Sequence, residues 1–380
     1  MDIIQTLAQQ LNLTAEQVGK TVQLIDEGNT IPFIARYRKE VTGSLDDSVL
    51  RTLDEKLTAL RNLAQRKQEV QDLIGAQGKL TEEVRAAIER AATVTEVDDI
   101  YRPFRPKRKT RASVARERGL EDLAILLFAQ EKSYTPSIEE QAARFVDPER
   151  EVPDVAAALQ GAMDIVAEEV SDNADYRREL RRLTFDAGSL TSKAAKEEDS
   201  VYAMYYDFSE PLRKLPGHRI LAIHRGEKEE FLKVALTVPE DVVLGYLYNR
   251  VLSGNRSPAE PYVREAVTDA YNRLIAPSIE REIRNDLFDT ACEGAIKVFS
   301  DNLGHLLMQP PLKGKVVLGF DPGYAHGCKL AVVDPTGKVL DTAVVYPTIK
   351  PRAEEAARVV KRQLRRGRGR HRKRHCITGE

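Results

Sequence analysis

The chain has 380 residues, of which 42% are apolar and 31% charged, so it is long enough for two or three domains, and its composition excludes a largely disordered or collagen-like protein. The formal net charge of -1 conceals a strong asymmetry. Residues 351–380 contain eleven Lys and Arg against three Glu, which leaves 47 basic and 56 acidic side chains in residues 1–350. An acidic body therefore precedes a strongly basic tail.

Three further features of the sequence bear on the cellular compartment of the protein. The first residues lack a basic segment followed by an apolar one, so no secretory signal is expected. No apolar run approaches the roughly 18 residues of a membrane span. The three cysteines are few and far apart, which argues against a disulfide framework. We expect a cytoplasmic protein without a membrane partner and without a cofactor.

Helical periodicity dominates the first three hundred residues. Thr14 and Gln17 form a capping box before an apolar stripe that ends at Gly28. Ser44 with Asp47 predicts the start of a longer helix. Further helices are predicted at 81–92, 117–130, 153–171, 174–185 and, with interruptions, from about 239 to 308.

Two regions depart from this helical pattern. Between Leu215 and Leu236 the apolar period is ambiguous, and a small hairpin and a strand-to-helix turn are both compatible with it. After the stiff Gln309-Pro310-Pro311 segment, strands are predicted at 316–321, 329–333 and 339–345, with a domain boundary near 312.

Asp321 is a candidate catalytic or metal-binding residue, because it ends a buried strand and is followed by Pro322 and Gly323. RNase H-like nucleases use such an aspartate to hold a divalent metal, and actin-like kinases use the same hairpin to bind phosphate. Two-metal hydrolysis needs several converging carboxylates, which one aspartate does not supply. The structural alternative is that Asp321 only stabilises the turn.

A basic segment between Tyr101 and Gly119 is the second candidate site, since phosphate attracts such a patch and aromatic rings can stack on unpaired bases. The structural alternative is a solvated loop whose rings, those of Tyr101 and Phe104, pack on neighbouring helices. The predicted nucleic-acid contacts are Arg102, Arg105, Lys107, Arg108, Lys109 and Arg111. For the smaller cluster at 36–39, the structural alternative is favoured.

Seven sequence segments resemble the bacterial Tex family of transcription accessory proteins. They occur in the same order as in that family and cover residues 1 to about 360. They are Ile31–Glu40, Asp99–Lys109, Ala115–Leu120, His218–Lys228, Pro277–Glu282, Leu306–Lys315 and Gly319–Gly323.

The resemblance implies a mainly α multidomain protein with a helix-turn-helix-like part, followed by a truncated α/β RNase H-like domain. The expected divisions are an N-terminal helical domain at 1–190, a central helical region at 191–312, the start of the RNase H-like domain at 313–360 and a basic tail at 361–380. In the family, helix-hairpin-helix modules and an oligonucleotide-binding barrel follow, and we expect this chain to end before them. Because an RNase H-like sheet cut after three strands has an open edge, we expect residues 313–380 to be poorly ordered in isolation.

The basic tail has two explanations. Where the family continues with Ala-Ile-Gly-Asn-Gly-Thr-Ala-Ser-Arg-Glu, this chain reads Arg370 to Gly379. A reading frame shifted by one nucleotide permits all of these family residues, so one hypothesis is a frameshift between Lys361 and Arg366, which the coding DNA would test. The alternative is a genuine arginine-rich nucleic-acid-binding tail.

The resemblance implies a non-enzymatic accessory factor that works with RNA polymerase or other parts of the transcription machinery. It is expected to bind nucleic acid, with RNA favoured over DNA. Asp321 is then a vestigial metal ligand. Two alternatives stay open. One is a metal-dependent RNase H-like nuclease or resolvase, and the other is a helical scaffold that docks proteins.

Overall fold

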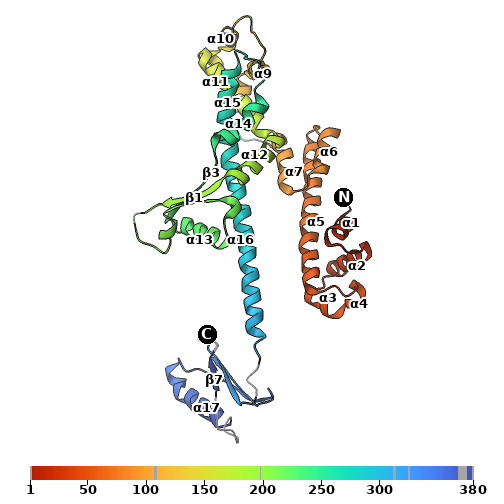
Figure 1. Cartoon of the computed structure of the whole chain (residues 1–380), viewed down its shortest axis with the longest axis vertical. Helices are drawn as coiled ribbons and strands as arrows, with labels where there is room; N and C mark the ends of the chain where they lie inside the picture. Colours follow the sequence, from red (N-terminus) through yellow and green to blue (C-terminus); the bar gives the residue numbers. More distant parts are fainter. Residues whose placement is uncertain are drawn as a thin grey trace. The chain divides into compact units, whose positions relative to one another are not determined.

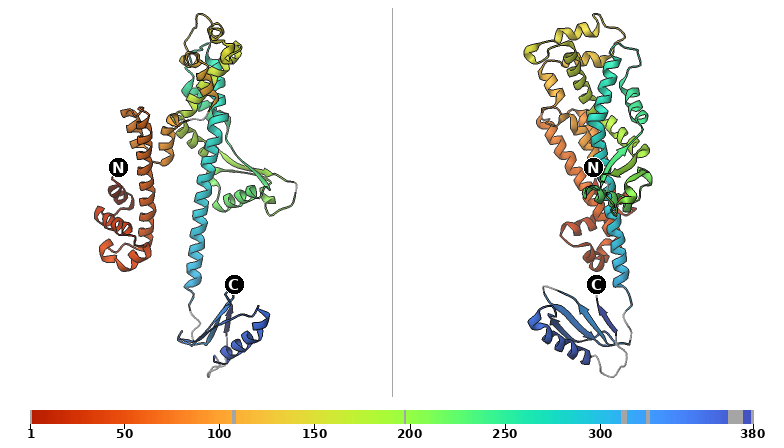
Figure 2. Two further views of the ribbon diagram at one scale, coloured as in Figure 1. Left: turned by 180° about the vertical axis from the view of Figure 1, so that it is seen from behind. Right: turned by 90° about the vertical axis from the view of Figure 1, so that its left-hand side faces the viewer.

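A computed structural model describes residues 2–106, 109–196, 198–310, 314–323, 326–366 and 375–378. The chain divides into two compact units, Met1–Ala295 and Ile296–Glu380, which are described separately (Figures 1 and 2). No helix in the described part of the chain combines the length and apolar character needed to cross a membrane.

The first unit begins with helices arranged around the 30-residue helix α5 (Figure 1). Leu7 of α1 and Val18 of α2 pack against Leu53 and Leu57 of α5 in one apolar core. The predicted capping box of Thr14 and Gln17 is present at the start of α2. These helices are α1 (Ile3–Leu11), α2 (Ala15–Asp26), α3 (Ile31–Tyr37), α4 (Lys39–Thr42), α5 (Asp47–Ala76), α6 (Glu82–Arg90) and α7 (Val94–Tyr101).

The start of α5 differs from the prediction in its capping residue. The side chain of Asp46 accepts a hydrogen bond from the amide of Val49 at 2.9 Å, so Asp46 caps the helix rather than Ser44. Ser44 has a positive φ of 62° and follows Gly43, which ends α4. A carboxylate also interacts more favourably than a hydroxyl with the helix N-terminus.

A larger helical bundle completes most of the first unit. Its central helix α11 is buried along much of its length and contacts α8, α9 and α15. The chain from α15 through the π-helical segment η6 into α16 continues without a break. The helices are α8 (Arg111–Glu117), α9 (Glu121–Ala129), α10 (Ile138–Ala142), α11 (Val155–Asp172), α12 (Ala174–Ala187), α14 (Glu240–Val251), α15 (Glu260–Asp269), η6 (Ala270–Ile275) and α16 (Ala276–Leu307).

A three-stranded antiparallel sheet in the first unit was not predicted. Its order is β2-β1-β3, with β1 at Ser189–Ala194, β2 at Asp207–Pro211 and β3 at Leu232–Thr237. Helix α13 (Gly217–Lys228) precedes β3. Both alternatives proposed for 215–236 are therefore wrong, because the segment is a helix followed by a strand. Short 3₁₀ turns occur at η1 (Arg102–Phe104), η2 (Ala143–Phe145), η3 (Pro148–Arg150), η4 (Ala203–Tyr205) and η5 (Leu212–Lys214).

The second unit contains the three predicted strands, β4 (Val317–Asp321), β5 (Cys328–Val333) and β6 (Val339–Val345). After the turn η7 (Lys350–Arg352), helix α17 (Ala353–Arg366) packs its apolar face against the sheet through Ala356. A fourth strand, β7 (His375–Thr378), pairs in parallel with β4, giving the order β6-β5-β4-β7. The expected three-stranded sheet is therefore wrong.

The predicted boundary at 312 and residues 367–374 and 379–380 of the basic tail lie outside the described residues. The frameshift hypothesis stays a prediction. The domain divisions at 190, 312 and 360 stay predictions.

Candidate nucleic-acid interface

The basic segment after α7 is anchored by its aromatic side chains. Tyr101 is only 6% exposed and packs with Leu63 and Ile74 of α5, while Phe104 in η1 packs against the same core. Stacking of a base on Tyr101 is therefore excluded, and the rings follow the structural alternative. Their burial fixes the start of the basic segment on the surface of α5 and α7.

Two of the predicted nucleic-acid contacts already have acidic partners. Arg102 forms an ion pair with Asp172, with 3.3 Å between Nε and Oδ1. Burial, together with the nearby Arg177, lowers the pKa of Arg102. Arg105 lies over the ring of Tyr101 and forms a longer pair with Asp98 at 3.7 Å. Arg102 is the less exposed of the two and has the shorter ion pair, whereas Arg105 is more exposed and its pair with Asp98 is weak.

Lys109 and Arg111 are exposed, as is Arg105. Neither Lys109 nor Arg111 forms a direct ion pair within the described residues, although Arg111 is close enough to Asp164 of α11 to oppose the rise in pKa that burial causes for this carboxyl. Lys107 and Arg108 lie outside the described residues. Arg111 occupies the first position of α8, which has no acidic residue in its first turn. A cation is unfavourable at a helix N-terminus, and an anion bound there would offset this cost.

The cap of α8 holds this cationic turn in place. Thr110 and Ser113 form a capping box, and the Thr110 hydroxyl donates a hydrogen bond to Glu168 of α11 at 3.1 Å. Glu168 also pairs with Arg116 at 2.6 Å. The backbone that presents Arg111 is therefore fixed by contacts to a buried helix.

Asp321 lies exposed at the end of β4, in register with Lys329 on β5. Among the described residues, no group of three or more His, Cys, Asp or Glu side chains lies close enough together to hold a metal ion. The described side chains thus bring no second and third carboxylate to Asp321.

An ionic cluster that sequence analysis missed joins α7, α12 and α16. Arg177 is fully buried and donates hydrogen bonds to Asp99 at 2.8 Å, Ser278 at 2.7 Å and Glu282 at 3.0 Å. Arg181 donates to the same two carboxylates at 2.9 and 2.8 Å. Burial lowers the pKa of Arg181, but Asp99 and Glu282 outweigh it, so the net shift is upward. The only sequence signal was a polar residue on the inner face of α12.

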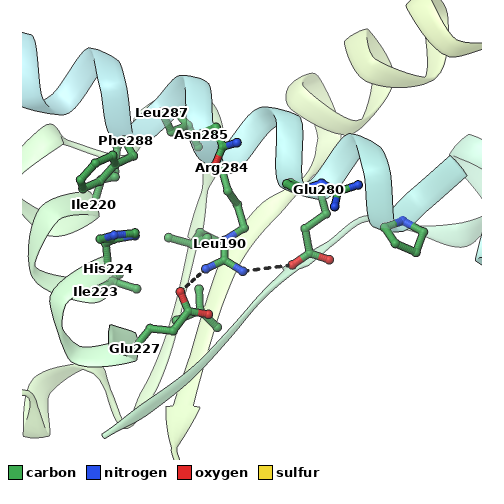
Figure 3. A pocket seen from close by; sticks show the side chains of 13 residues that line it. Leu190, Ile220, Ile223, His224, Glu227, Glu280, Arg284, Asn285, Leu287 and Phe288 are labelled. Carbon is green, nitrogen blue, oxygen red and sulfur yellow. Dashed lines mark hydrogen bonds and ion pairs between the residues drawn. The ribbon is translucent and has the colours of Figure 1, made fainter. Parts of the chain in front are cut away.

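A cavity of about 420 Å³ lies between α13, the sheet and α16 (Figure 3). Its polar groups are largely satisfied within the protein. Arg284 crosses it and pairs with Glu227 and, at 3.7 Å, with Glu280. Glu280 also accepts a hydrogen bond from the Leu236 amide at 3.1 Å, and His224 stacks on Phe288 with ring centroids 4.1 Å apart. This arrangement fastens the sheet to α16.

Comparison with known proteins assigns three segments of the chain to one family. Residues 1–75 match the Tex-like protein N-terminal domain, 133–299 the Tex central region-like domain and 315–369 the Tex protein YqgF-like domain. The chain belongs to the Tex family. This Tex-family chain has the basic segment of 102–111 between the first two matched domains.

Similar curated proteins share most of the chain. It is 44% identical over 349 residues to the uncharacterized protein YdcI of Bacillus subtilis, covering 90% of the chain and 48% of that protein. It is 38% identical over 354 residues to the transcriptional accessory protein Tex of Neisseria gonorrhoeae, covering 91% and 46%. It is 32% identical over 361 residues to human S1 RNA-binding domain-containing protein 1, covering 91% and 36%. The chain therefore spans about half the length of the bacterial relatives it matches.

Proposed function

We propose that this Tex-family chain acts in transcription as an accessory factor. It binds nucleic acid, RNA in preference to DNA, through the basic segment of 102–111. The observation that carries the proposal is the exposure of Lys109 and Arg111, neither of which forms a direct ion pair among the described residues, although Asp164 lies near Arg111. Relatives named as a transcriptional accessory protein and as an S1 RNA-binding domain-containing protein support it. RNA polymerase is the proposed protein partner.

The roles within the segment differ. Lys109 and Arg111 contact phosphates, and Arg105 joins them by leaving Asp98. Arg102 stays paired with Asp172 and positions the segment. The same phosphate role stays a prediction for Lys107 and Arg108.

We infer that the second unit has an RNase H-like arrangement, which its match to the YqgF-like domain supports. Three antiparallel strands, a helix and a fourth strand parallel to the first follow one another along the chain. Because the described residues bring no group of three potential metal ligands together at Asp321, binding without cleavage is the proposed activity. The helix-turn-helix-like part and the cytoplasmic location stay predictions.

The test is binding of the full chain to a fluorescent 20-nucleotide RNA at several salt concentrations. The Lys109→Gln/Arg111→Gln variant is compared with Lys132→Gln/Arg144→Gln, which removes the same two exposed charges elsewhere. The logarithm of the association constant falls linearly with the logarithm of the salt concentration, and loss of two phosphate contacts makes this slope less steep by about 1.4. Equal slopes for the two variants would refute the proposed site, and metal-dependent cleavage abolished by Asp321→Asn would establish the nuclease instead.

A further inference from the structure

Two aromatic rings on α3 form an exposed surface that is distinct from the basic segment. Phe33 and Tyr37 are one helical turn apart, and their ring centroids lie 5.2 Å apart. The Tyr37 residue is 55% exposed, and Phe33 is half-buried beside it. We call this surface, together with Arg36, Arg38 and Lys39, the aromatic platform.

The exposure of the aromatic platform follows from how α3 is packed. Ile34 points into a core formed with Leu24, Leu45 and Leu50 and is fully buried. Residues 33 and 37 lie on a different face of the helix from Ile34, so they cannot reach that core at the same time. A tyrosine that contributes little to the core leaves a large ring face available to a ligand.

Three cations surround the rings. The guanidinium of Arg38 lies 5.2 Å from the centre of the Phe33 ring, and that of Arg36 lies 5.9 Å from the centre of the Tyr37 ring. Lys39 is exposed at the start of α4. Within the described residues none of the three forms an ion pair, although the exposed Glu40 follows them directly.

We propose that the aromatic platform binds single-stranded nucleic acid. An unpaired base stacks on Tyr37, and the phosphates on either side contact Arg36, Arg38 and Lys39. Stacking tolerates any base, because every base has an aromatic face. A duplex offers no such face, since its bases are already stacked, so the platform discriminates against double strands.

This inference rests on the proposed nucleic-acid binding, but it concerns a second contact surface and its preference for single strands. A protein partner is the less favoured occupant. Tyr, Phe and Arg are common at protein interfaces as well, but Lys is depleted there, and three neighbouring cations without an ion pair favour a polyanion. Phosphates on both sides of a stacked base use all three cations.

The test measures binding of the full chain to a 12-nucleotide oligouridine and to a duplex of equal length. Tyr37→Ala is expected to weaken oligouridine binding about 5- to 150-fold, while Tyr37→Phe keeps it. Phe128→Ala removes an exposed ring of α9 and serves as the matched control. The salt dependence of oligouridine binding becomes less steep by about 2 in the triple variant Arg36→Gln/Arg38→Gln/Lys39→Gln.

The outcomes separate the two proposals. If Lys109→Gln/Arg111→Gln weakens binding but Tyr37→Ala does not, the platform is refuted and the proposed function stands. If Tyr37→Ala weakens oligouridine binding and Lys109→Gln/Arg111→Gln has no effect, the platform is supported and the basic segment is refuted. If the full chain binds no nucleic acid, both fail. Equal loss of duplex and oligouridine binding by Tyr37→Ala would refute the single-strand preference.

Discussion

Replacing Arg177 with Met tests the buried ionic cluster. The two hydrogen bonds of Arg177 to Asp99 and Glu282 are each worth about 1.5–3 kcal/mol, and the bond to Ser278 adds about 1 kcal/mol. Its Nη1 is buried and has no hydrogen-bond partner among the residues that the structure describes, which offsets about 1–3 kcal/mol of this gain. Loss of one member of a buried ion pair typically costs about 3–5 kcal/mol. Because Arg181 still pairs with both carboxylates, we expect the free energy of unfolding to decrease by an amount near the lower end of this range.

The assay is urea unfolding followed by far-UV circular dichroism, because the chain has no tryptophan. Arg178→Met on the same helix is the matched control, since Arg178 is 62% exposed and pairs with Asp175 at the surface. We expect this control to change stability by less than about 1 kcal/mol. Equal effects of the two substitutions would refute the view that Arg177 joins α7, α12 and α16.

Three further predictions concern stability. Both polar atoms of the Gln363 side-chain amide are buried on the inner face of α17 and have no hydrogen-bond partner in the described part of the chain. Gln363→Leu should therefore raise the melting temperature and stabilise by about 1–3 kcal/mol, and a lower melting temperature would contradict this. Burial raises the pKa of Tyr271 to about 12, so the folded state keeps a proton that the unfolded state loses above its ordinary value near 10. Stability is therefore lost as pH rises from 10 to 12. Urea unfolding at pH 8 and pH 11 should show that the Tyr271→Phe variant loses about 1.4 kcal/mol less stability between these two pH values than the original protein. An equal loss in both proteins would contradict the raised pKa of Tyr271. A Cβ at Gly161 would overlap Leu120, whereas one at Gly245 meets nothing within 4 Å. Thermal unfolding should therefore show that Gly161→Ala destabilises the protein by about 1–3 kcal/mol and that Gly245→Ala stabilises it by about 1 kcal/mol. A change of the same sign for both variants would contradict this packing.

Local signals predicted the parts of the fold in which one short segment determines its own structure. The capping box of Thr14 and Gln17 depends on residues three apart, and it marks the start of α2. The strands β4, β5 and β6 are hydrophobic runs bounded by turn residues such as Gly337, whose φ is 89°. In each case the information lies within a few neighbouring residues.

Structure that depends on distant residues was not predictable in this way. Strand β1 is stabilised by β3, which follows about forty residues later, and its own sequence, Ser-Leu-Thr-Ser-Lys-Ala, has little apolar character. Arg177 likewise finds its partners 78 and 105 residues away. The sequence predicted a helix at 174–185, and only the packing of three helices makes this arginine a core residue.

The same dependence on packing separates the two basic clusters. Tyr101 and Tyr37 each lie beside several cations in the sequence, and sequence analysis favoured the cluster at Tyr101 as the binding site. Tyr101 is buried against α5, however, whereas the ring of Tyr37 is exposed. Arg102 is paired with Asp172, whereas Arg36 has no acidic partner among the described residues. A cation that already has a carboxylate partner within the protein is less available to a ligand, so a polyanion is bound by the exposed cations that the fold leaves without such a partner. An exposed ring beside them adds the preference for an unpaired base.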